Sequence, residues 1–179
     1  MSQIKCFTKA GDILAKVVRE GRRINFASND LELSDSIFNF SVTAHSMRDW
    51  CIKELGWDTN SQQKQSFHDT CNAYEYLKYA RDIANGSKHF GLDNNKTSTV
   101  DRVENNSGSF SYIDAHGNTL GQSAEAPTAK ILLPDGKDIL AFTFAFTVIQ
   151  NWKEIMVSHQ LTFDEARCKE INIALAYAR

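Results

Sequence analysis

The sequence contains very few residues that interrupt helices. Only two of its 179 residues are proline and nine are glycine. Because proline removes a backbone donor and glycine weakens a helix interior, their scarcity leaves room for long uninterrupted helices. Eleven phenylalanines and three tryptophans supply bulky core side chains, and a chain of this length can bury a core without disulfide or metal staples. We therefore expect a single, mainly α domain over residues 1–179.

Apolar side chains recur at helical spacing in five segments, which predicts a helical bundle of about five helices. The predicted helices cover residues 11–25, 34–55, 65–90, 140–159 and 163–177. The third of these has an alternative form with a break near Cys71. Short connections between successive helices favour antiparallel neighbours.

Local signals indicate where these helices begin and end. Ser34 or Asp35 is placed to cap the second helix, and Gly56 is placed to end it. The Thr-Phe-Asp-Glu segment at 162–165 fits a capping box at the start of the last helix. Gly86 lies inside the third helix, where glycine is unfavourable, and it indicates a close approach of another helix or a local break.

The middle of the chain differs from the helical segments around it. It is polar and rich in Asn, Ser, Thr and Gly, with weak strand character at 97–103 and 109–113. Residues 129–133 and 138–140 then flank a Pro-Asp-Gly-Lys turn, which predicts a hairpin. We expect a small antiparallel β insertion at about 97–140 that covers one end of the bundle or presents an edge to a partner.

Charge and cysteine spacing argue against several classes of protein. The formal net charge of −2 argues against retention on nucleic acid by bulk positive charge, although a local basic site stays open. The four cysteines lack the spacing of a zinc site or of a disulfide framework, and we expect Cys51, Cys71 and Cys168, which lie among predicted helical residues, to be small buried apolar side chains. No N-terminal segment resembles a signal peptide, and no stretch approaches the roughly 20 apolar residues that cross a bilayer. We therefore expect no membrane association, no metal or other cofactor, and a cytoplasmic location.

Two segments carry residues suited to chemistry. The first contains His45 and Asp49, which lie four residues apart and so share one face of the predicted second helix. A carboxylate in that position can orient an imidazole and raise its basicity. The alternative is a surface pair, or a polar cluster that joins two helices.

The second segment contains Arg81, Asn85 and His89. They follow one side of the predicted third helix over about 12 Å, at 1.5 Å per residue. An arginine can hold a phosphate through two hydrogen bonds, and a histidine can move a proton near neutral pH. The alternative is a solvent-facing side that ends in a cationic turn, because Lys88 and His89 also favour the negative end of the helix dipole.

The residues Ala84-Asn85-Gly86-Ser87-Lys88-His89 resemble the signature of the HEPN superfamily, which reads Arg, a polar residue, three variable residues and His. This sequence matches the polar and His positions, at Asn85 and His89, but Ala84 stands where the family has its arginine. The chain also resembles bacterial helical proteins with an Asp-Trp helix followed by an Asn-x-x-Lys-His helix, and that likeness implies no activity. The HEPN resemblance covers about residues 34–90 and implies a helical bundle, metal-independent RNA cleavage and a site formed across a homodimer.

Two functions from different classes follow. In the first, the protein is a HEPN-like RNA-binding or metal-independent RNA-cleaving protein of a defence or toxin–antitoxin type. His89 would move the proton, Arg81 would bind phosphate and Asn85 would orient the substrate. His45, Asp49 and Lys88 would support that site. In the second, the protein is a non-catalytic protein-interaction module with a structural polar cluster. An open cleft shared by these residues favours catalysis, whereas a closed and fully bonded cluster favours architecture.

Overall fold

The computed structural model describes residues 3–88, 98–110 and 124–168. Helices dominate these residues, and a small three-stranded antiparallel sheet joins them, which confirms the predicted mainly α fold with a β insertion. The helices are α1 (Ala10–Asn25), α2 (Asp30–Glu54), α3 (Ser61–Ala73), α4 (Glu75–Lys88) and α5 (Ala141–Ser158). A further helical turn covers residues 165–168.

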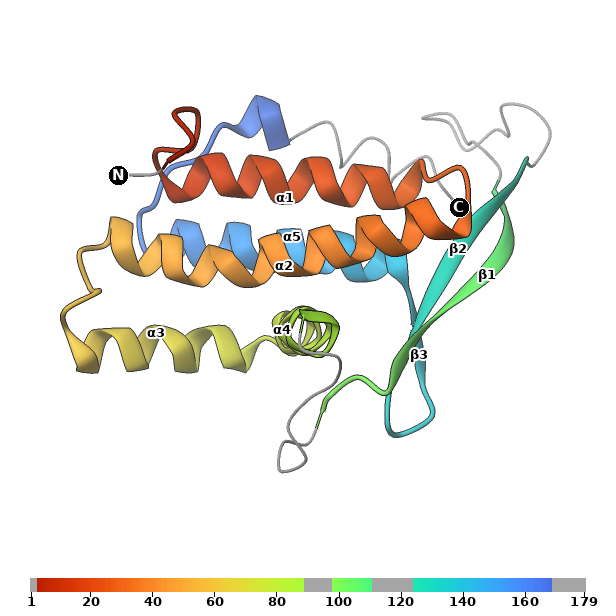
Figure 1. Ribbon diagram of the computed structural model, residues 1–179. Coiled ribbons are helices and arrows are strands. Elements are labelled where there is room, and N and C mark those ends of the chain that lie inside the picture. Colours follow the sequence, from red (N-terminus) through yellow and green to blue (C-terminus); the bar gives the residue numbers. More distant parts are fainter. Residues whose placement is uncertain (1–2, 89–97, 111–123, 169–179) are drawn as a thin grey trace, which may run out of the picture.

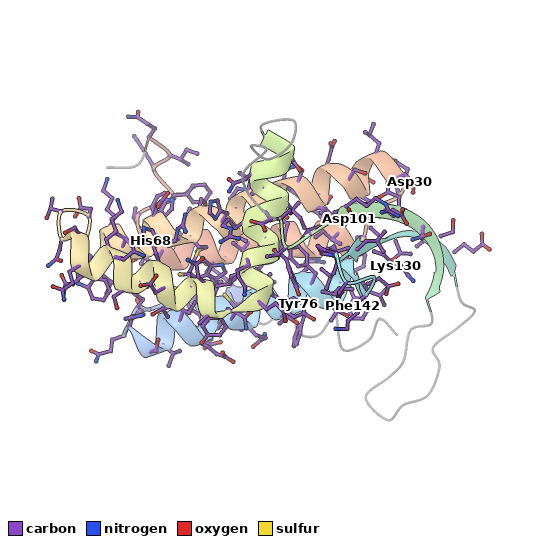
Figure 2. The ribbon with its side chains drawn as sticks, turned by 90° about the horizontal axis from the view of Figure 1, so that it is seen from below. Asp30, His68, Tyr76, Asp101, Lys130 and Phe142 are labelled. Atoms are coloured by element: carbon purple, nitrogen blue, oxygen red, sulfur yellow. The ribbon has the colours of Figure 1, made fainter. Side chains whose placement is uncertain are left out.

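The helices form one packed body with the sheet at its end. The helices α1, α2 and α5 run side by side, and α4 crosses them steeply (Figures 1 and 2). Their buried side chains meet in the middle of this bundle, where the Phe40 and Phe144 rings pack edge to face at 5.5 Å between centroids. Cys51, Cys71 and Cys168 are buried there as small apolar side chains, as the sequence predicted.

The predicted third helix is two helices, as its alternative form anticipated. The break is at Tyr74, whose extended backbone (ψ 115°) separates α3 from α4. From there α4 continues through Gly86, where an added Cβ would meet nothing within 4 Å among the described residues. The expectation of a close approach or a break at Gly86 is therefore wrong. The close approach occurs at Gly11 instead, where an added Cβ would lie 2.4 Å from the carbonyl oxygen of Thr162.

The cap of α2 lies five residues before Ser34, the earlier of the two predicted caps. The side chain of Asn29 accepts a hydrogen bond from the backbone nitrogen of Glu32 at 2.9 Å, so Ser34 and Asp35 lie inside the helix. The carboxylate of Glu32 in turn accepts from the backbone nitrogen of Ser28 at 2.7 Å. These bonds satisfy amides that a helix start leaves free, which is why the helix extends back to Asp30.

The structure confirms the predicted end of α2 and corrects the predicted start of the last helix. Gly56 ends α2 with φ +69°, and its nitrogen donates to the carbonyl of Lys53, as predicted. The predicted capping box is wrong, because Asp164 rather than Thr162 caps the last described turn. Its Oδ1 accepts from the backbone nitrogen of Ala166 at 2.9 Å. The remainder of the predicted helix over 163–177 lies outside the described residues from 169 onward.

The sheet has the order β1 (Arg102–Phe110), β2 (Ala124–Leu132) and β3 (Asp138–Leu140). The pairing of β2 with β3 confirms the predicted hairpin around the Pro-Asp-Gly-Lys turn. The expectation of strand at 97–103 is confirmed from Arg102 and is wrong for residues 98–100, where the Thr99 backbone donates to a helix side chain. The nitrogen of Asp101 already donates to the carbonyl of Leu132 on β2. Residue 97, and residues 111–113 of the strand expected at 109–113, lie outside the described residues. Ala129 and Ile131 of β2 are fully buried, which fixes the inner face of the sheet against the helices.

Candidate functional site

One polar cluster is centred on the buried side chain of Asp82. Its Oδ2 accepts two hydrogen bonds from Thr99, one from the backbone nitrogen and one from Oγ1, both at 2.7 Å. Its Oδ1 accepts from Nε of Arg81 at 2.7 Å. Residue Asp82 is only 6% exposed, so these three donors replace the water that an ionised carboxylate needs.

Arg81 is held from a second side as well. Its Nη1 donates to Oδ1 of Asn72 at 3.2 Å, which links α4 to α3. The Arg81 side chain keeps 29% of its surface exposed. The guanidinium that the sequence analysis assigned to phosphate is therefore engaged by a carboxylate and an amide of the same chain.

The electrostatics of Asp82 agree with this bonding. Burial by itself would raise the pKa of the Asp82 carboxyl, but the hydrogen bonds from Arg81 and Thr99 outweigh burial and hold the pKa below its ordinary value. The carboxylate is therefore ionised at neutral pH and bound to donors. A group in this state stabilises the local structure and is a poor general base.

Of the other predicted site residues that the structure describes, two lie on α4 and two on α2. Asn85 is partly buried on α4, one turn beyond Arg81, and Lys88 is the last residue of that helix. On α2, His45 is partly buried and Asp49 is exposed. His89 lies outside the described residues. Arg81 donates hydrogen bonds to Asp82 and Asn72, neither of which was a predicted site residue.

A second set of polar side chains comes from α2 and α3. Nε of Arg48 and Nδ1 of His68 are each buried and have no hydrogen-bond partner in the part of the chain that the structure describes. Burial lowers the pKa of His68, and the positive charges of Arg48 and Lys64 lower it further. Figure 2 shows His68 on α3. No local spacing connects Arg48 with His68, so the sequence offered no signal for this pairing.

Cys51 and Cys71 are buried free thiols. Burial raises the pKa of the Cys71 thiol to about 12 and raises that of Cys51 still further from its ordinary range. Because the thiolate is the reactive form, these cysteines are poor nucleophiles at neutral pH. Within residues 3–88, 98–110 and 124–168, no group of three or more His, Cys, Asp or Glu side chains is arranged to hold a metal ion.

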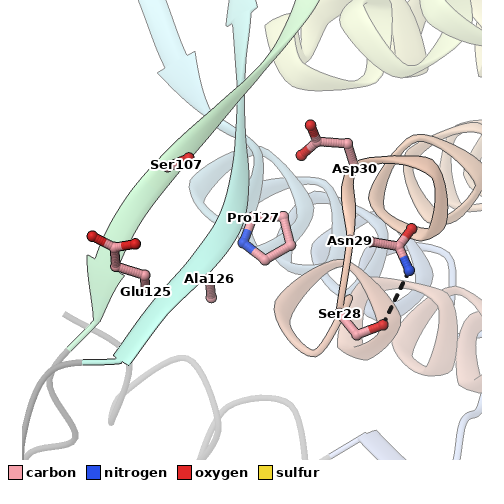
Figure 3. Close-up of a pocket in the computed structure, with 7 residues that line it drawn as sticks. All are labelled: Ser28, Asn29, Asp30, Ser107, Glu125, Ala126 and Pro127. Carbon is pink, nitrogen blue, oxygen red and sulfur yellow. Dashed lines mark hydrogen bonds between the residues drawn. The ribbon is translucent and has the colours of Figure 1, made fainter.

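A pocket of about 330 Å³ lies between the start of α2 and the paired strands β1 and β2. Figure 3 shows its two walls, one from the turn between α1 and α2 and the other from the strands. The lining residues are Ser28, Asn29, Asp30, Ser107, Glu125, Ala126 and Pro127. None of them belongs to the predicted site, because the pocket joins segments that are nearly 100 residues apart in the chain.

Comparison with known proteins does not assign the chain to a family. No protein-family model, no curated protein and no solved structure matches the chain. The resemblance to the HEPN superfamily therefore stays a prediction from sequence. None of the described helices combines the length and the apolar composition needed to cross a membrane.

Proposed function

We propose that this protein is a non-catalytic protein-interaction module in which the polar cluster on α4 is architectural. The observation that supports this proposal is the bonding of Asp82, which accepts from Arg81 and twice from Thr99. This is a bonded arrangement of the kind expected for a structural role. It holds the segment before β1 against α4 and so fixes one end of the sheet on the helical body.

Use of Arg81 as a phosphate ligand would carry an energetic penalty. A two-bond phosphate contact that uses Nε would take the guanidinium away from the carboxylate of Asp82, which is 6% exposed. Losing a hydrogen bond to a buried charged group typically costs about 1.5–3 kcal/mol. A phosphate contact would first have to offset that loss, which favours the structural role.

The HEPN-like alternative keeps its own predictions. It requires His89 to move a proton, Asn85 to orient the RNA, and a homodimer to complete the site.

The state of the cysteines bears on the location of the protein, because all four cysteines are free thiols. This supports our proposal of a reducing, cytoplasmic compartment.

A paired measurement of RNA cleavage and stability separates the two functions. Wild type, Arg81→Gln and His89→Ala are incubated with structured RNA in a chelator, and each is melted thermally. We expect no turnover by the wild type and a lower melting temperature for Arg81→Gln. Lys78→Gln is the matched control, since it removes the same charge from the same helix. Turnover that is lost in Arg81→Gln or His89→Ala at an unchanged melting temperature would overturn the proposal.

A further inference from the structure

Among α1 to α5, the helix α3 buries the fewest side chains. Of its 13 residues, all of them described, Phe67 and Cys71 are buried. It lies at the edge of the bundle, away from the sheet, and packs against α2 and α4 (Figure 1). Gly56 (φ +69°) and Tyr74 (ψ 115°) interrupt the helical backbone on either side of it. Because few buried apolar contacts mean a low free energy of local opening, α3 is suited to open separately from the other helices.

The side chain of Phe67 anchors α3 to the rest of the molecule. Its ring centroid lies 6.2 Å from the ring of Trp57, in the loop after α2, and 5.1 Å from the ring of His159, at the end of α5. His68 follows Phe67 directly in the chain (Figure 2). The imidazole of His68 therefore lies close to the contact that attaches α3.

The surroundings of His68 suit a neutral imidazole and oppose a protonated one. Its Nδ1 is buried and has no hydrogen-bond partner in residues 3–88, 98–110 and 124–168. A protonated imidazole carries a hydrogen on both ring nitrogens. While α3 is attached, protonation would therefore create a buried donor without an acceptor, which is costly.

Charged side chains of both helices surround His68: Arg48 and Asp49 on α2, and Lys64 and Asp69 on α3. Burial is the largest cause that lowers the pKa of His68 below its ordinary 6.5, and the positive charges of Arg48 and Lys64 lower it further. The two carboxylates raise the pKa, but both aspartates are exposed and water screens their charge. The attached helix therefore favours the neutral ring.

We propose that α3 is an acid-released helix, which leaves α2 when His68 is protonated while α1, α2, α4 and α5 stay folded. In the released state the imidazolium is hydrated, and both of its N–H groups donate to water. Release uncovers the Phe67 ring, the Cys71 thiol and the part of α2 that they cover. This regulation does not depend on the proposed interaction function, because it concerns the attachment of α3 whatever the protein binds.

Proton linkage sets the pH range and the steepness of this release. Because the pKa of His68 in the attached helix lies below the ordinary 6.5, the released state binds more protons between these two values. The attachment of α3 is therefore strongest above pH 6.5 and weakens as the pH falls toward the lowered pKa. The equilibrium constant for opening should rise by up to about tenfold for each pH unit in this range and level off below it.

Hydrogen exchange of backbone amides, measured from about pH 7.5 to about pH 5 and corrected for intrinsic exchange rates, tests this proposal. We expect the protection of α3 to fall by up to about tenfold per pH unit below 6.5. Low urea should accelerate exchange in α5 more than in α3, because a local opening exposes less surface than global unfolding. His68→Asn, whose side chain does not titrate, should make α3 protection independent of pH. His45→Asn is the matched control, since it removes a histidine from α2 and should keep the wild-type slope.

A second variant keeps the histidine and changes only its surroundings. In Arg48→Met the pKa of His68 moves toward 6.5, so α3 should lose less protection over the same pH range than in the wild type. This comparison decides the question if α3 is already unprotected at every pH in His68→Asn. Wild-type α3 protection that is constant with pH, or an unchanged slope in His68→Asn, would overturn the proposal. Equal protection and equal urea dependence of α3 and α5 would also overturn it, because the helices would then open together.

Discussion

Asp82 on α4 and Thr99 in the segment before β1 are joined by two hydrogen bonds of 2.7 Å to the same carboxylate oxygen. The two residues are 17 positions apart, so the bonds fix a point at which the β insertion meets the helices. A carboxylate that accepts both the backbone amide and the hydroxyl of one residue orients that residue completely. We therefore regard this contact as a main determinant of how the sheet is placed.

Replacing Asp82 with alanine should lower the free energy of unfolding by about 2–4 kcal/mol. The change removes three hydrogen bonds to a charged group and leaves Arg81 without its buried partner. Urea denaturation monitored by circular dichroism measures the effect. Thr99→Val, which removes only the hydroxyl donor, should cost about 1 kcal/mol. A loss below about 0.5 kcal/mol for Asp82→Ala would mean that these bonds contribute little in solution.

Stability should fall in acid, and Asp82 and Glu20 should contribute to the fall. Burial would raise the pKa of Glu20, but the hydrogen bonds and charges of Lys16 and Arg23 lower it below the ordinary 4.5. For Asp82 the pKa lies below the ordinary 3.8. A carboxyl with a lowered folded pKa stabilises the protein above its ordinary pKa, and this contribution is lost as the pH falls through the folded pKa.

Urea titrations at pH 7 and at pH 3 measure this dependence. Asp82→Asn and Glu20→Gln should each lose less stability between the two pH values than the wild type does, because each lacks one of the titrating groups. Glu104→Gln is a suitable control, since it removes an exposed carboxylate on β1. An acid slope that is the same in all four proteins would contradict the assignment.

Two glycine substitutions should have opposite effects. Gly11→Ala places a Cβ 2.4 Å from the carbonyl oxygen of Thr162, a backbone atom that has little room to move, so we expect a loss of about 1–3 kcal/mol. Gly86→Ala places a Cβ in open space inside α4 and should stabilise the protein by about 0.4–1 kcal/mol. Thermal melts of both variants compare them directly. Stabilisation by Gly11→Ala would contradict the observed packing.

The pKa of His68 should rise when Arg48 is replaced. Burial is the first cause of its lowered pKa, and the charge of Arg48 is the second. In Arg48→Met a side chain of similar length remains, and the pKa of His68 should move toward its ordinary 6.5. An NMR titration of the imidazole Cε1 proton gives this value. Asp49→Asn should move the pKa in the opposite direction, because the Asp49 carboxylate raises it.

The helices were accessible from sequence because each buries one face, and a buried face imposes a local period on apolar residues. The helix expected at 11–25 is observed at Ala10–Asn25, and the one expected at 140–159 at Ala141–Ser158. The turn after β2 was accessible because Pro-Asp-Gly-Lys is a favourable turn sequence, and its Gly136 adopts φ +84°. The cap of α2 was missed because Ser34 and Asp35 suit a helix start as well as Asn29 does, and spacing cannot choose among them.

The sequence by itself determined the helical segments, the hairpin and the cysteines that would be buried, since these depend on periodicity and turn chemistry within a few residues. Only the tertiary structure decided which polar groups meet. Arg81 and Asp82 are sequence neighbours, but their partners Asn72 and Thr99 come from other elements. The pocket likewise joins residues 28–30 to residues 107 and 125–127. Such contacts follow from how the helices and strands pack in three dimensions, and local spacing carries no record of that packing.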